Sequence, residues 1–148
     1  MNSTAFAAVL AGAAGLAGAV QIAVQARLNE RVGSIEAAAT ASLIGAILAL
    51  VVLLAAKRSL GGIGDAVAGP KWQLLGGLMS IFIILSITIA GPRIGVVATT
   101  AFLIAAQFAL AAIIDRYGWF GVDQIALSWT RLLGLGLLVA GAALTLRR

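Results

Sequence analysis

The stretch MNSTAFAAVLAGAAGLAGAVQIAVQA, residues 1–26, contains no charged side chain. Similar uncharged and strongly apolar runs follow at 37–56, 72–92, 94–114 and 132–146. A helix needs about 20 apolar residues to cross the hydrocarbon core of a bilayer. The first four runs reach that length, and the last one does so if its helix begins near Ile125 and includes Arg131. The sequence therefore predicts an all-α integral membrane protein with five transmembrane helices in a single domain, residues 1–148.

The composition indicates a protein that lies almost entirely within the membrane. Hydrophobic residues make up 62% of the chain and charged residues 10%, and the mean hydropathy is +1.12, whereas a soluble domain has about 25% charged residues. The chain has no cysteine and no histidine. We therefore expect no disulfide, no metal site, no cofactor and no enzymatic activity. The ten Lys and Arg lie near predicted helix ends, which favours interfacial anchoring over nucleic-acid binding.

The predicted helices end at charged or glycine-rich positions. We place them at 4–26, 35–56, 71–90, 94–114 and 125–146. The longest loop contains glycines and Pro70, and the sequence GPRIG at 91–95 predicts a tight turn between two antiparallel helices. Gly12, Gly15 and Gly18 recur at a spacing that favours close contact between helices in lipid. We expect a multi-pass protein of the cell membrane, inner or plasma.

Lys and Arg are divided almost evenly between the two sides of the membrane. With five spans, the first face holds the N-terminus and the loops 57–72 and 115–128. That face carries four or five of them, namely Lys57, Arg58, Lys71, Arg116 and, if it reaches that way, Arg131. The second face carries five, namely Arg27, Arg31, Arg93, Arg147 and Arg148.

Orientation in the membrane follows the excess of Lys and Arg on the cytoplasmic side, so this near-equal division gives the chain almost no preferred orientation. We expect dual topology and an antiparallel homodimer, or a pair with a close paralogue. Such a pair resembles a ten-helix transporter built from inverted repeats. The alternative is a fixed orientation imposed by a partner.

Polar side chains within the predicted helices mark a candidate substrate site. Gln21, Gln25 and Asn29 are four residues apart and stack on one face of the first helix. Gln107 lies about two-thirds along the fourth helix, and inverting a second copy brings its Gln107 level with Gln21 of the first. Buried amides are costly in hydrocarbon unless they are paired. These side chains either hold the helices together or line a polar cavity.

Arg131 is the only charge expected within a span. It could reach to the interface, pair with Asp115 across the adjoining loop, or meet an anionic substrate. No carboxylate is expected in mid-membrane, which argues against proton-coupled export of cations.

A set of short motifs occurs in order along nearly the whole chain: Gln21, Gln25, Asn29, Gly33, Glu36, Trp72, Gly76, Gly77, Gly91, Pro92, Arg93, Ile94, Gly95, Ala106, Gln107, Asp115, Arg116, Tyr117, Gly118, Arg131, Gly134 and Gly141. With this set the chain resembles the small YdcZ-type family of the drug/metabolite transporter superfamily. The resemblance implies antiparallel dimers and substrate translocation, and it implies no particular substrate.

Together these features predict a transporter of a small polar or anionic metabolite that works by alternating access at the interface of an antiparallel dimer. The predicted site contains Gln21, Gln25, Asn29 and Gln107, with Arg131 as a further candidate. The alternatives are a non-transporting membrane scaffold or assembly protein, and a channel.

Overall fold

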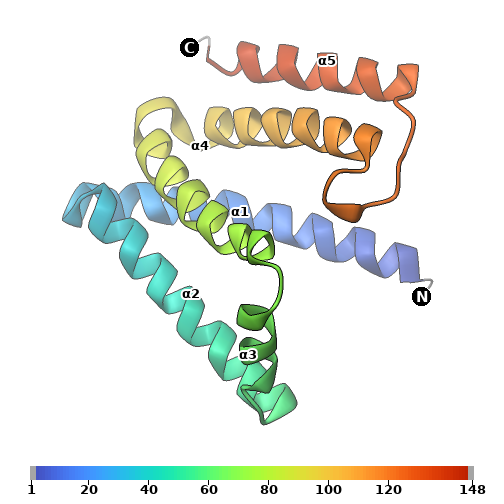
Figure 1. Cartoon of the computed structure of the whole chain (residues 1–148). Coiled ribbons are helices and arrows are strands. Elements are labelled where there is room, and N and C mark those ends of the chain that lie inside the picture. Colours follow the sequence, from blue (N-terminus) through green and yellow to red (C-terminus); the bar gives the residue numbers. More distant parts are fainter. Residues whose placement is uncertain (1–2, 147–148) are drawn as a thin grey trace. The chain divides into compact units, whose positions relative to one another are not determined.

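The computed structural model describes residues 3–146, so Arg147 and Arg148 of the charge count lie outside the described residues. Its long helices are α1 (Ser3–Val32), α2 (Ser34–Lys57), α4 (Leu75–Tyr117) and α5 (Trp129–Leu144). Three short elements lie between them: α3 (Gly61–Ala68), η1 (Lys71–Leu74) and η2 (Trp119–Gly121) (Figure 1). The described residues contain no strand, and the all-α prediction is confirmed.

Two compact units make up the fold. One unit combines the chain up to Ile22 with the chain from Arg93 onward, and the other is Ala23–Pro92. Both α1 and α4 pass from one unit into the other. We call Ala23–Pro92 the inner unit and the rest the outer unit; the single-domain interpretation stays a prediction.

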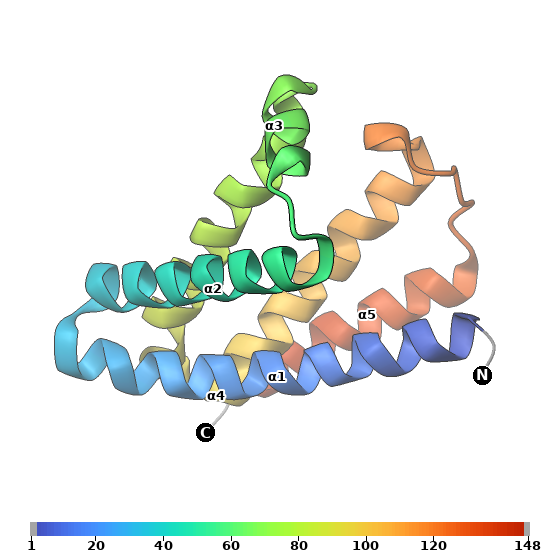
Figure 2. The same ribbon diagram turned by 90° about the horizontal axis from the view of Figure 1, so that it is seen from below.

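The inner unit begins with a reversal between α1 and α2 that uses a single residue, Gly33 (Figure 2). Gly33 has φ 95° and ψ 162°, a backbone conformation that is essentially restricted to glycine. Its N–H donates to the carbonyl of Asn29 at 2.9 Å, and its own carbonyl accepts from Ala37 at 3.0 Å. The reversal therefore leaves neither backbone group of Gly33 unpaired.

A second glycine with the same conformation interrupts α4. Gly95 has φ 84° and ψ 164°, which is not helical, so α4 consists of two helical segments, 75–94 and 96–117. The break predicted between the third and fourth helices is present, but it falls at the last residue of the GPRIG motif. Residues 91–94 stay helical because proline removes only its own N–H from the helix and leaves φ in the helical range.

We expect Gly95→Ala to lower the free energy of unfolding by about 1–2 kcal/mol, because alanine is strained at this backbone conformation. Unfolding in mixed detergent micelles measures the change. Gly77→Ala is the matched control: Gly77 is helical, and an added Cβ there would have no atom within 4 Å among the described residues. The control should be neutral or slightly stabilising, and an equal loss in both variants would contradict a special role for Gly95.

Among residues 3–146, three helical stretches are long and apolar enough to cross a membrane: Thr4–Val32, Ser34–Lys57 and Lys71–Tyr117. The third contains the break at Gly95, and each of its two segments has about the 20 residues that one crossing needs. The shorter apolar helix is Trp129–Leu144. The count of five spans stays a prediction.

The loops contain more structure than the sequence suggests. α3 and η1 occupy much of the glycine-rich loop. α5 begins at Trp129 rather than at Ile125, because Ser128 caps the helix: its hydroxyl accepts the N–H of Arg131 at 3.3 Å. Ahead of this cap the chain folds back on the end of α4, where the Ile125 N–H donates to the Asp115 carbonyl at 2.8 Å.

The buried positions are few and mostly small, and most large apolar side chains are exposed, as expected for a surface that faces lipid. Those in the inner unit are Gln25, Ala37, Ala38, Ile87, Thr88 and Gly91, and those in the outer unit are Ile22, Ala98, Thr99, Ala105 and Ala142.

The glycine stripe of α1, formed by Gly12, Gly15 and Gly18, faces open space as far as the described residues show. A Cβ added at any of the three would have no atom within 4 Å among the described residues. The close helix contact that this spacing favours is therefore not made inside one described chain.

Candidate functional site

Two polar side chains and one backbone carbonyl are joined by hydrogen bonds within the inner unit. The Asn29 amide on α1 donates from Nδ2 to the Thr88 carbonyl on the first segment of α4 at 3.0 Å. The Ser34 hydroxyl at the start of α2 donates to Asn29 Oδ1 at 2.8 Å. We call Asn29, Ser34 and Thr88 the Asn29 cluster; it links three helices through one amide.

The Thr88 carbonyl needs this amide because of Pro92. In an α-helix a carbonyl accepts from the N–H four residues later, and proline has no N–H. Pro92 stands four residues after Thr88, so the Thr88 carbonyl loses its helical partner. Thr88 is fully buried, and an unpaired carbonyl there would be costly. Asn29 supplies the missing donor from a position 59 residues away in the chain.

Gln25 lies one helical turn before Asn29 and on the same face of α1. It is 3% exposed, and its Oε1 is buried with no hydrogen-bond partner among the described residues. Buried polar atoms in folded proteins are nearly always paired. Gln25 therefore carries an acceptor that residues 3–146 leave free.

The other two predicted amides are placed differently. Gln21 and Gln107 both belong to the outer unit and both are exposed. The single chain therefore does not assemble all four amides into one buried site. The predicted site, in which Gln21 and Gln107 of opposite copies become level, stays a prediction.

Arg131 pairs with Asp115 in the outer unit. Its Nη1 lies 3.1 Å from Asp115 Oδ2, which is the pairing across the adjoining loop that the sequence left as one alternative. The two side chains are 38% and 34% exposed, and they border a cavity of about 130 Å³ with Phe108, Ala111 and Ala112. The Asp115 carboxylate offsets the positive charge of the Arg131 guanidinium. Arg131 therefore attracts an anionic solute less strongly than an unpaired arginine would. Its predicted role towards substrate stays a prediction.

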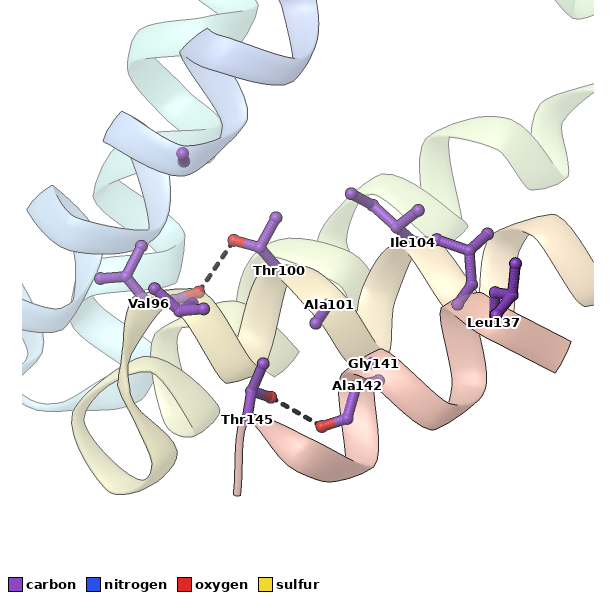
Figure 3. Close-up of a pocket in the computed structure, with 11 residues that line it drawn as sticks. Val96, Thr100, Ala101, Ile104, Leu137, Gly141, Ala142 and Thr145 are labelled. Atoms are coloured by element: carbon purple, nitrogen blue, oxygen red, sulfur yellow. Dashed lines mark hydrogen bonds between the residues drawn. The ribbon is translucent and has the colours of Figure 1, made fainter. Parts of the chain in front are cut away.

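The outer unit contains an apolar groove of about 530 Å³ (Figure 3). α1 contributes Ala19, the second segment of α4 contributes Thr100 and its neighbours, and α5 contributes Gly141 and Thr145. The hydroxyls of Thr100 and Thr145 donate to carbonyls of their own helices, at 2.8 Å and 2.6 Å, as Figure 3 shows. Because those hydroxyl protons are engaged, the groove suits an apolar occupant better than a polar solute.

Sequence reasoning missed the roles of Ser34 and Thr88. A usable signal was present for Thr88, since a proline four residues later always leaves a carbonyl to be paired. The sequence gives no comparable signal for Ser34, whose partner is a side chain. The described residues contain no group of three side chains suited to a metal ion.

Comparison with known proteins gives two matches. The family described as "Putative inner membrane exporter, YdcZ" matches residues 6–144. The inner membrane protein YdcZ of Escherichia coli (strain K12) is 30% identical over 137 residues, which cover 92% of this chain and 91% of that protein. No solved structure matches. Together with the long apolar helices, these matches identify a multi-pass protein of the inner membrane.

Proposed function

The chain belongs to the family described as "Putative inner membrane exporter, YdcZ", and from this premise we propose that it transports a small polar or anionic metabolite by alternating access at the interface of an antiparallel dimer. Family membership supports a transporter in general terms. The dimer, the mechanism and the substrate class are the parts that this proposal adds.

The observation that carries the proposal is the interruption of α4. Pro92 and Gly95 break the helical hydrogen bonding within four residues. Transporters often bind their substrates through freed backbone groups and the polar side chains beside them. In this chain the Asn29 cluster binds one such freed carbonyl.

Two features support a second, inverted copy as the partner. The glycine stripe of α1 has no neighbour within the described chain, although small residues in lipid are typical of helix contacts. Gln21 and Gln107 are exposed amides on apolar helices, and an exposed amide in hydrocarbon gains from a polar partner. In an inverted pair each Gln107 is level with the other copy's Gln21, which supplies that partner.

The test is flux into proteoliposomes over a broad panel of metabolites. We expect saturable uptake of at least one solute. Gln21→Ala and Gln107→Ala should each lower this uptake several-fold while the dimer yield stays largely unchanged, because each amide contributes a hydrogen bond worth about 1 kcal/mol. The dimer yield is measured by size-exclusion chromatography in detergent.

Other outcomes would contradict the proposal. Folded dimer without saturable flux would favour a scaffold, and flux that never saturates together with single-channel conductance would favour a channel. Equal loss of dimer and flux in the two variants would show that the glutamines only hold helices together. Gln124→Ala is the matched control, because Gln124 lies outside the long helices and donates only a long hydrogen bond of 3.3 Å to the Tyr117 carbonyl.

A further inference from the structure

We propose that the transported solute is uncharged and donates an N–H or O–H hydrogen bond to Oε1 of Gln25. This inference rests on the proposed transport function and narrows its substrate class. It assigns Gln25 a role distinct from that of its neighbour Asn29, although the sequence places the two in the same stack.

The buried amide of Gln25 carries a hydrogen-bond acceptor that lacks a donor among the described residues. Gln25 is 3% exposed and its Oε1 has no partner among the described residues. A buried amide oxygen without a donor is rare and costly, more so where the surroundings are hydrocarbon. A ligand that brings its own donor into this position removes that cost. Gln25 Oε1 can therefore accept a hydrogen bond from a solute, since the described residues supply no donor to it.

Asn29 is already engaged and does not compete for this role. Its Nδ2 donates to the Thr88 carbonyl at 3.0 Å, and its Oδ1 accepts from Ser34 at 2.8 Å. Both polar atoms of the amide are used in joining helices. Asn29 is therefore a positioning residue that fixes its face of α1 against α4, and it holds Gln25, one turn earlier, on that same face.

The charges argue for an uncharged solute. Arg131, the cation nearest the interior of a span, is paired with Asp115, and Glu36 is exposed in the first turn of α2. No charged side chain is buried among the described residues, so a charged solute at Gln25 would find no buried counter-charge. Moving a charged solute through a dry interior without such a partner is very costly.

Gln25 is closed to solvent in the conformation described. Alternating access requires a state in which the site is sealed, and a second state in which the surrounding helices separate. The buried Oε1 fits the sealed state.

The experiment compares the full-length protein with Gln25→Met in proteoliposomes. Methionine keeps the length of the side chain and removes both polar atoms. The probes are the uncharged ribose and sorbitol, the anions succinate and phosphate, and the cation tetraphenylphosphonium. Gln73→Met is the matched control, because Gln73 lies exposed in η1, outside the long helices.

We expect saturable uptake of an uncharged probe by the unmodified protein, with a KM that rises about tenfold in Gln25→Met and stays unchanged in Gln73→Met, as expected for the loss of one hydrogen bond. An unchanged KM in Gln25→Met would overturn the inference and leave only a bound water for Oε1. Saturable uptake of the anions or the cation alone would overturn it as well, while leaving transport intact. No saturable uptake of any probe would instead contradict the proposed function.

Gln25→Glu covers the case in which Gln25→Met does not fold, since glutamate has nearly the same shape. A buried carboxylate without a counter-charge favours a cationic partner. We expect Gln25→Glu to gain saturable uptake of tetraphenylphosphonium and to keep uptake of the uncharged probe, because a carboxylate oxygen still accepts the hydrogen bond of the solute. Unaltered selectivity in this variant would overturn the inference.

Discussion

Three lysines added to the first face of the membrane are expected to abolish transport by the lone chain. The variant combines Ser59→Lys, Asp65→Lys and Asp123→Lys, all at exposed positions between the long helices. It raises the Lys and Arg on that face from four or five to seven or eight, against five on the second face. Every copy should then insert with the first face in the cytoplasm, and no inverted partner would remain.

The complementary variant adds Glu30→Lys, Val32→Lys and Leu146→Lys to the second face and should be equally inactive alone. Co-expression of the two variants should restore saturable flux, because each supplies the orientation that the other lacks. Reporter fusions to the C-terminus check the orientations directly. We expect both compartments to be labelled for the unmodified chain and one compartment for each lysine variant.

The control combines Ser59→Gln, Asp65→Gln and Asp123→Gln, which changes the same three positions without adding a positive side chain. It should retain both orientations and full flux. Full activity of either lysine variant expressed alone would contradict an antiparallel pair. So would an unmodified chain whose C-terminus is always found in one compartment.

The second large effect is expected for Asn29→Leu, which should lower the free energy of unfolding by about 2–3 kcal/mol. The substitution keeps the approximate size of the side chain but leaves the Thr88 carbonyl without a donor and the Ser34 hydroxyl without its acceptor. A buried polar group that loses its partner costs about 1–3 kcal/mol. Unfolding in mixed detergent micelles measures the loss.

A double-mutant cycle with Pro92→Ala tests the reason for this effect. Alanine at position 92 restores the N–H that Thr88 lacks, so Asn29→Leu should cost about 1–2 kcal/mol less in the Pro92→Ala background. Val24→Ala on the same helix is the control, because Val24 is exposed and should show no coupling to Pro92→Ala. Additive effects of Asn29→Leu and Pro92→Ala would mean that Asn29 does not replace the lost helical hydrogen bond.

The local chemistry of the sequence accounts for most of the helices and for the break in α4. The uncharged runs predict helices because hydrocarbon allows no unpaired backbone group, and the helices at Ser34–Lys57 and Leu75–Tyr117 follow from them. The GPRIG motif predicts a break, and Gly95 provides it. The start of α5 was misplaced because Ser128, which caps it, lies inside an apolar stretch in which hydropathy gives no boundary.

The candidate site was less predictable, because the role of an amide depends on its partner and not on its spacing. Gln21, Gln25 and Asn29 look equivalent in sequence. The fold gives Asn29 two hydrogen bonds, leaves the Gln25 carbonyl buried and free, and exposes Gln21. Arg131 shows the same limit, since the sequence left its partner open and only the fold brings Asp115 to 3.1 Å.

By itself, the sequence determined what each segment does alone: which stretches are apolar enough for lipid, where a glycine or proline interrupts them, and how evenly the positive charges are shared. Only the tertiary structure decided which polar groups meet. Helix formation depends on neighbours a few residues apart, whereas the pairing of Asn29 with the carbonyl that Pro92 leaves open joins residues 59 positions apart. Such a pairing depends on which faces of the helices pack together. The hydropathy of the two helices does not determine those faces.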